Sequence, residues 1–78
     1  MGRAIKQKEK EIFGNVMKIA VLKDGRSSCK IARTLKIDDA GFYRLKEGQN
    51  LPDILNYLKI KDWMSGLGID LDSMLRAN

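Results

Sequence analysis

Reactive side chains are scarce in this sequence. Cys29 is the single cysteine, which excludes an internal disulfide, and the chain contains no histidine. Zinc sites, haem sites and most general-base arrangements depend on histidine or on several cysteines. Cys29 lies in a short helical pattern, where a lone cysteine is most often a small packing residue. We therefore expect no enzyme activity, no metal and no cofactor.

Basic side chains are the second chemically informative group. The 78 residues carry a net charge of +5, but the charge is unevenly distributed. Residues 1–37 hold ten Lys and Arg against three acids, a net of +7, whereas residues 38–78 hold five against seven, a net of −2. A positive field suits an anionic polymer or surface, although a basic surface that is merely solvated has the same composition.

The overall composition indicates one globular domain. Hydrophobic residues make up 44% and charged residues 32% of the chain, which is ordinary for a folded protein. A domain of this size has a small core and usually needs efficient helix packing or a partner subunit. No apolar run reaches the length of a membrane span, and the basic start MGRAIKQKEK is not followed by an apolar segment. We expect a cytoplasmic protein.

The stretch from Ser27 to Leu45 is the central pattern of the chain. Its apolar residues have helical spacing in two halves, and the phase changes at residues 36–38. This predicts a helix over 28–35 and a second helix that runs to about residue 47, joined by a tight turn. Ser27 and Asp38 are suitable N-cap residues, and Asp39 complements the dipole of the second helix. The two helices should meet at a steep angle.

Three further helices are expected to position this pair. Residues 4–23 have helical apolar spacing, with Gly14 as a weak point worth up to about 1 kcal/mol relative to alanine. Gly48 ends the second helix of the pair, Pro52 opens a fourth helix, and Asp70 caps a fifth over 71–75. The predicted apolar positions in the first helix are Ile5, Ile12, Phe13, Val16, Met17, Ile19 and Ala20. In the fourth helix we expect Ile54, Leu55, Leu58 and Met64 to point inward, with Tyr57 and Trp63 at the margin.

These features resemble the helix-turn-helix domains of the Cro and phage-repressor type, also called Xre-like. With Ser28 as the first position, the family motif has a small residue at the fifth position and apolar residues at the fourth, eighth, tenth, fifteenth and eighteenth. The matching residues here are Ile31, Ala32, Leu35, Ile37, Phe42 and Leu45. The resemblance extends over residues 13–75 through Gly48, Pro52 and the segments YLKIKDWM (57–64) and IDLDSML (69–75).

The sequence departs from the family pattern at three places. Lys36 occupies the ninth position, where glycine is typical, and a left-handed conformation there costs lysine roughly 1 kcal/mol. Ser28 stands where many members have a glutamine that reaches a phosphate. The reading helix begins with Asp38 and Asp39, which would face a polyanion, and it contains Gly41.

The resemblance implies an all-α, five-helix, lambda-repressor-like bundle in which the second and third helices form the helix-turn-helix. Residues 1–10 would be a basic arm, able to continue as helix, and residues 11–78 a single domain. The third helix would enter the major groove. The residues implied in base readout are Asp39, Ala40, Tyr43 and Arg44. The residues implied in phosphate contacts are Ser28, Lys30, Arg33, Lys36, Lys46, Gln49 and Asn50, with Arg3, Lys6 and Lys8 in the arm.

A single domain of this kind reads too few base pairs to select one operator, so a two-fold homodimer on paired half-sites is expected. The C-terminal third contains more apolar residues than two short helices readily bury. The predicted dimer interface, in the C-terminal helices, is drawn from Trp63, Met64, Leu67, Ile69, Leu71 and Met74, of which we expect about half to belong to the core.

The resulting prediction is a small phage or bacterial transcriptional regulator that binds operator DNA as a homodimer in the cytoplasm. The alternative is a protein-interaction adaptor on the same fold, such as an antitoxin, antirepressor or inhibitor, with weak or no DNA binding. Asp38 and Asp39 motivate this alternative, because an acidic helix start suits a protein partner better than a polyanion.

Overall fold

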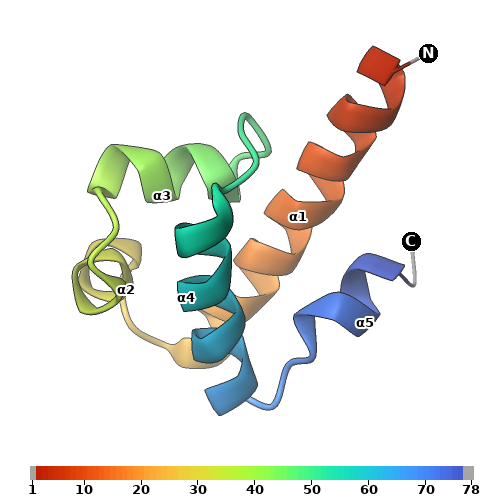
Figure 1. The fold of residues 1–78 in the computed structure, drawn as a ribbon. Coiled ribbons are helices and arrows are strands. Elements are labelled where there is room, and N and C mark those ends of the chain that lie inside the picture. The colour runs from red at the N-terminus through yellow and green to blue at the C-terminus, as the bar shows by residue number, and fades with distance from the viewer. Residues whose placement is uncertain (1, 77–78) are drawn as a thin grey trace.

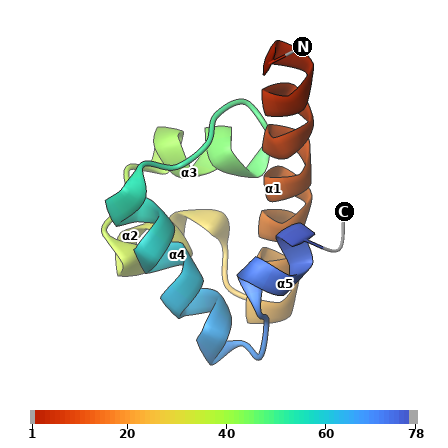
Figure 2. The ribbon, with the colours of Figure 1, turned by 45° about the vertical axis from the view of Figure 1, so that its right-hand side comes forward.

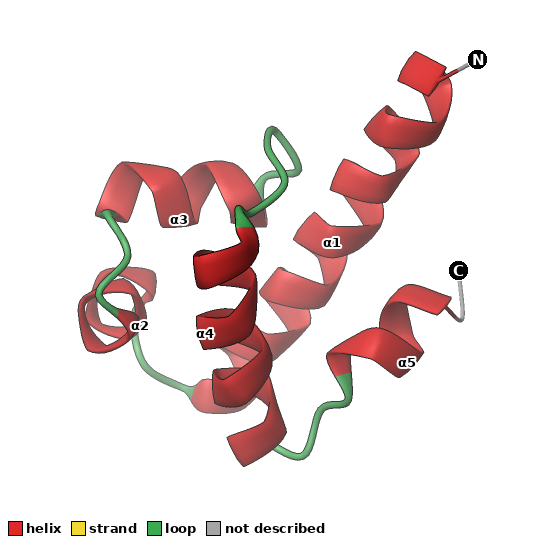
Figure 3. Ribbon diagram, in the orientation of Figure 1, coloured by secondary structure: helices red, strands yellow, loops and turns green. Residues whose placement is uncertain are grey.

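The computed structural model of the chain describes the backbone of residues 2–76 and the side chains of residues 8–76. Within these limits all regular structure is helical, which confirms the all-α prediction (Figures 1 and 3). The five helices are α1 (Gly2–Asp24), α2 (Ser28–Leu35), α3 (Asp39–Lys46), α4 (Ile54–Gly66) and α5 (Leu71–Arg76). None of the described helices is long and apolar enough to cross a bilayer.

Helix α1 is the support on which the other elements assemble. Helix α3 packs across α1, α2 packs on α3, and α5 returns along α1. Helix α4 bridges the two sides because it contacts both α2 and α5. The first turns of α1 extend beyond the other helices, as Figure 2 shows most clearly.

The two short helices begin where the sequence places N-cap residues. The Ser27 hydroxyl accepts a hydrogen bond from the backbone N–H of Lys30 at 3.3 Å, and the Asp38 carboxylate accepts one from the backbone N–H of Gly41 at 3.2 Å. Each cap satisfies an N–H that has no partner within its own helix. The predicted bounds of α2, 28–35, are confirmed.

Helix α4 starts two residues later than predicted. Pro52 lies outside the helix, and Asp53 is the N-cap, with its carboxylate 2.8 Å from the backbone nitrogen of Asn56. An aspartate at this position satisfies a first-turn N–H, which proline cannot do. At α5 the predicted cap is confirmed, since Asp70 accepts from the backbone N–H of Ser73 at 3.3 Å.

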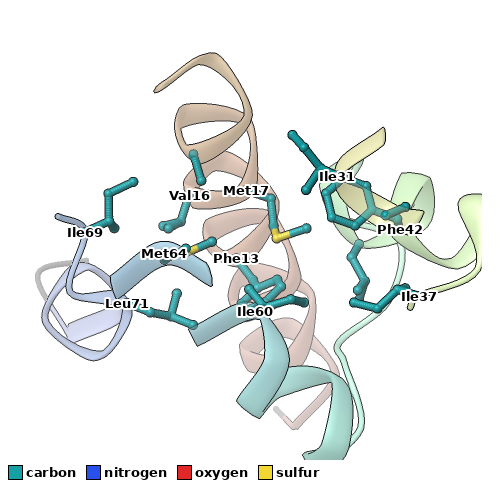
Figure 4. Packing of buried hydrophobic residues seen from close by; sticks show 13 residues of the cluster. Phe13, Val16, Met17, Ile31, Ile37, Phe42, Ile60, Met64, Ile69 and Leu71 are labelled. Atoms are coloured by element: carbon teal, nitrogen blue, oxygen red, sulfur yellow. The ribbon is translucent and has the colours of Figure 1, made fainter. Parts of the chain in front are cut away.

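The core lies on both sides of α1 (Figure 4). Phe13 and Met17 of α1 occupy its centre together with Ile60 of α4, and all three are essentially buried. The α2–α3 side contributes Ile31, Ala32, Ile37, Phe42 and Leu45, and the α4–α5 side contributes Met64, Ile69 and Leu71.

The predicted inward face of α4 is wrong at three positions. Ile54, Leu55 and Leu58 are 71%, 67% and 54% exposed, whereas Met64 is buried as expected. The centre of the inward face is Ile60. Each residue turns the helix by about 100°, so Leu58 lies nearly opposite Ile60 and points away from α2 and α5. In α1, Ile19 was likewise expected to be buried and is exposed.

Gly14 is a packing requirement and not the weak point that helix propensity suggests. A Cβ atom at this position would lie 2.8 Å from the backbone nitrogen of Gly48 and 2.9 Å from the carbonyl oxygen of Lys46. Both atoms belong to the backbone at the end of α3, so neither can rotate away. Glycine therefore allows α3 to sit directly on α1.

Asp24 joins three helices at the end of α1. Arg26 donates to both carboxylate oxygens of Asp24, at 2.7 and 3.0 Å, and the indole N–H of Trp63 donates to it at 2.8 Å. Arg26 also donates to the hydroxyl of Thr34 in α2 at 3.1 Å. The Arg26 guanidinium, followed by the Trp63 indole, holds the pKa of Asp24 well below its usual range. This network was not anticipated from the sequence.

A second polar group joins α4 to α5. The Tyr57 hydroxyl donates to the carboxylate of Asp72, and Lys61 forms an ion pair with the same carboxylate at 2.9 Å. The hydrogen bond to Asp72 raises the pKa of Tyr57 to about 12. The bonds from Tyr57 and then Lys61 lower the pKa of Asp72.

Candidate nucleic-acid interface

The turn between α2 and α3 is closed by Lys36 in the left-handed conformation, with φ 59° and ψ 43°. The N–H of Lys36 donates to the carbonyl of Arg33 at 3.1 Å, and the N–H of Ile37 donates to the carbonyl of Ala32 at 2.9 Å. In Figure 1, α2 is seen almost end-on while α3 lies across the view, so the helices meet at a steep angle. The expected pair of short helices and their tight turn are present.

The apolar residues of this pair fill the space between its helices and α1. Ala32 is fully buried between larger side chains, as expected for a small residue at the point where two helices touch. The buried members are Ile31, Ala32, Ile37, Phe42 and Leu45, with Leu35 partly buried. Because these side chains point inward, the polar residues of α2 and α3 are left to face solvent.

The exposed side of α3 carries all the residues expected to read bases. Asp39, Ala40, Tyr43 and Arg44 are exposed, and their spacing of one, three and one residues places them along one side of the helix. Phe42 and Leu45 occupy the opposite, buried side. The structure therefore brings the four predicted readout residues together on a single surface.

The two acids at the start of α3 have different surroundings. The Asp38 carboxylate is occupied by the N-cap hydrogen bond to Gly41. Asp39 is exposed in the first turn, where an acid complements the positive end of the helix dipole. Both carboxylates are exposed, and Asp38 differs in that one of its oxygens is engaged in the N-cap.

Two of the predicted phosphate ligands contact each other. The ammonium of Lys46 donates to the Ser28 hydroxyl at 3.3 Å and lies 5.6 Å from the centre of the Tyr43 ring. This contact joins the start of α2 to the end of α3. An ammonium has three donors, so Lys46 retains hydrogen-bonding capacity for an anion approaching between the helices.

The remaining predicted phosphate ligands surround the pair. Lys30, Arg33 and Lys36 are exposed along α2 and its turn, and Gln49 and Asn50 are exposed after α3. Sequence reasoning missed one neighbouring cation. This is Lys59, and its ammonium donates to the carbonyl of Lys36 at 3.3 Å. No local sequence signal could have identified it, because α4 reaches the turn only through tertiary packing.

The amino-terminal residues continue α1 and do not form an extended arm, since the helix begins at Gly2. Lys8 is exposed on this helix. The side chains of Arg3 and Lys6 lie outside the described residues. A further lysine of α1, Lys18, lines a shallow polar hollow with Lys46 at the junction of α1 and α3, but Glu11 and Glu47 also line that hollow and balance the two cations.

The predicted C-terminal dimer interface is wrong at three of its six positions, because Met64, Ile69 and Leu71 are buried in the monomer. Trp63, Leu67 and Met74 are partly buried and pack against the core. The reason is that α5 returns along α1 and covers these side chains, while the indole of Trp63 is held by Asp24.

Cys29 is also placed differently from the expectation. It is exposed on α2 and does not pack, because the inward side of this helix is taken by Ile31 and Ala32. Among the described residues, no group of acidic, cysteine or histidine side chains is arranged to hold a metal ion.

The candidate interface is thus the outer side of α3, flanked by the cations of α2, its turn and the neighbouring Lys59. No family model matches this chain, and the comparisons with curated proteins and with solved structures likewise give no match.

Proposed function

We propose that this protein binds double-stranded DNA sequence-specifically through α3, as a small transcriptional regulator with a helix-turn-helix of the Cro and phage-repressor type. The single observation that carries the proposal is that the α2–α3 pair has a buried apolar side and an exposed side that holds the predicted readout residues. Its apolar residues are buried, and Asp39, Ala40, Tyr43 and Arg44 remain together on one exposed side of α3. The proposal includes a lambda-repressor-like arrangement of the five helices.

Base readout is assigned to the exposed side of α3. In the major groove, Arg44 forms paired hydrogen bonds with guanine O6 and N7, and Ala40 contacts a thymine methyl group. Asp39 accepts from cytosine N4 and disfavours bases that present acceptors. Tyr43 reaches a base edge or a phosphate.

Phosphate contacts fix the position of α3 in the groove. Lys30, Arg33 and Lys36 supply cations on one flank, Lys46 supplies one at the other end, and Gln49 and Asn50 add neutral donors. These contacts carry no sequence information, but they release counterions and make binding salt-dependent.

The test is a selection from random duplexes, followed by affinity measurements over a range of salt concentrations. Arg44→Ala should weaken binding to the selected site by about 1–3 kcal/mol and relax the preference at one base pair. Lys30→Gln is the matched control among exposed cations. It should weaken binding to all duplexes alike and reduce the slope of log affinity against log salt by about 1.

Two results would contradict the proposal. One is a protein without salt-dependent affinity for any duplex. The other is an Arg44→Ala variant with unchanged specific binding.

The second candidate function is a protein-interaction adaptor, and the exposed carboxylate of Asp39 favours it. The double variant Asp38→Asn/Asp39→Asn separates the two functions, because asparagine is as good an N-cap as aspartate and α3 should remain folded. A DNA reader should then bind non-specific duplexes more tightly. An adaptor should lose its protein partner and gain no affinity for DNA.

A further inference from the structure

Helix α4 is apolar on two opposite sides. Ile60 and Met64 face the core, and three large side chains of the helix lie on its solvent side, continued by Leu51 in the loop that precedes it. We call these four residues the α4 stripe: Leu51, Ile54, Leu55 and Leu58, which are 42%, 71%, 67% and 54% exposed. Within the helix, the spacing of Ile54, Leu55 and Leu58 is that of a helix that packs against another helix.

The α4 stripe borders a hollow in the same surface. Leu51 and Ile54 line a hollow of about 390 Å³, with Phe13 of α1, Tyr57 of α4 and Leu75 of α5 in its walls. Glu9 is the one charged residue in the lining. In Figure 1, α4 passes in front of the other helices, and no helix covers its outward side. The stripe and the hollow thus form one continuous apolar surface.

We propose that the α4 stripe is the surface through which two copies of this chain associate, with the two α4 helices antiparallel across a two-fold axis. In a two-fold interface the same residues of both subunits meet near the axis, so a charge at the centre would face its own copy. Residues 54–58 contain no charged side chain. The centre of the stripe therefore satisfies the condition that a self-complementary surface must meet.

The spacing of the stripe also fits an antiparallel pair. With the axis at the level of Asn56, Ile54 of each copy faces Leu58 of the other. Leu55 of each copy then lies beside the axis. Leu51 precedes the helix and extends the apolar surface toward the hollow.

The small size of the surface sets the expected strength. Stable complexes bury roughly 800 Å² on each partner, which is more than four partly exposed side chains and one hollow provide. We therefore expect a reversible dimer with a dissociation constant of about 1–100 μM. The inference deepens the proposed function, because a two-fold axis beside α4 presents two copies of α3 to paired half-sites. It is tested without DNA, so that the two proposals can fail separately.

The first test is sedimentation equilibrium of the complete chain, without DNA, from about 1 μM to 1 mM. The wild type should pass from monomer to dimer over this range. Leu55→Glu should raise the dissociation constant at least tenfold, because it places a carboxylate beside the axis. Leu22→Glu is the matched control, since Leu22 is an equally large side chain, 83% exposed, on α1. It should leave the dissociation constant within about twofold of the wild type.

The second test checks the arrangement of the two copies. In a Cys29→Ser background, Leu55→Cys should give a covalent dimer with a short bis-maleimide reagent, and Leu22→Cys should not. Circular dichroism confirms that each variant is folded. A wild type that is monomeric at 1 mM, an equal effect of Leu55→Glu and Leu22→Glu, or cross-linking at residue 22 alone would each overturn the inference.

Discussion

The α2–α3 pair and α4 have opposite relations to water. In the pair, the large apolar side chains are mostly buried, and the outer surface carries Arg33, Arg44 and other polar groups. In α4, a buried apolar side is matched by an exposed apolar side of similar size. Charged groups retain their hydration until a polyanion replaces it, whereas exposed apolar groups gain from any surface that removes them from water. The first region suits nucleic acid and the second suits protein.

The two sides of α4 offer the strongest test of this contrast. Ile60→Ala removes a fully buried side chain and should lower the free energy of unfolding by about 2–5 kcal/mol. Leu55→Ala removes a side chain that is mostly in water and should change the free energy of unfolding by less than about 0.5 kcal/mol. Urea unfolding below the dimer concentration measures both. Equal losses would show that Leu55 is part of the monomer core.

The close packing of α3 on α1 can be tested at Gly14. Gly14→Ala should lower the free energy of unfolding by about 1–3 kcal/mol, because the added methyl group meets the backbone of Lys46 and Gly48. Gly41→Ala is the matched control within α3, where the nearest atom is 3.9 Å away. It should be neutral or stabilising by up to about 1 kcal/mol, as helix propensity predicts. A stabilising Gly14→Ala would contradict the close approach.

Asp24 connects the two regions through Arg26 on one side and Trp63 on the other. Its contribution to the free energy of unfolding should be lost at acid pH. The pKa of Asp24 is lowered in the folded state, so below the unfolded pKa of about 3.9 the unfolded chain binds more protons. The contribution of Asp24 to the free energy of unfolding should be constant above about pH 5 and fall as the pH drops below about 4. In urea titrations at a series of acid pH values, the free energy of unfolding of Asp24→Asn should fall less steeply with decreasing pH than that of the wild type.

The control for Asp24 is Asp62→Asn, which removes an exposed carboxylate of α4 and keeps the same change in net charge. If both variants flattened the acid loss equally, the network around Asp24 would not be its source.

The smallest expected effect lies in the turn of the α2–α3 pair. Lys36→Gly should raise the free energy of unfolding by about 0.5–1 kcal/mol, because glycine adopts the left-handed conformation without the clash of a Cβ atom. Lys36→Ala is the control, since it removes the same charge and keeps the Cβ atom. In thermal unfolding, the midpoint temperature should rise for Lys36→Gly and stay unchanged for Lys36→Ala. A rise for both variants would assign the effect to the loss of charge.

Local signals were sufficient for the α2–α3 pair. Ser27 and Asp38 are side chains that satisfy backbone groups three residues away, so their role depends on nearby sequence alone. The buried residues of the pair were also predictable, because each short helix has one apolar side. The exposed residues of α3 follow directly from the buried ones.

Local signals failed in α4, where the sequence is apolar on both sides. The segment ILNYLKIKDWM permits either Ile54 or Ile60 as the centre of the inward face, and only packing against α2 and α5 selects Ile60. The same limitation applies to Trp63, whose partner Asp24 is 39 residues away in the chain.

The sequence by itself determined the helical class, the N-caps of α2, α3 and α5 and the tight turn, because these depend on interactions within a few residues. The tertiary structure decided which side of α4 is left in water, why residue 14 must be glycine, and which of the C-terminal apolar residues belong to the core. Each of these depends on which surfaces meet after the helices have formed, and the spacing of residues along one helix does not contain that information.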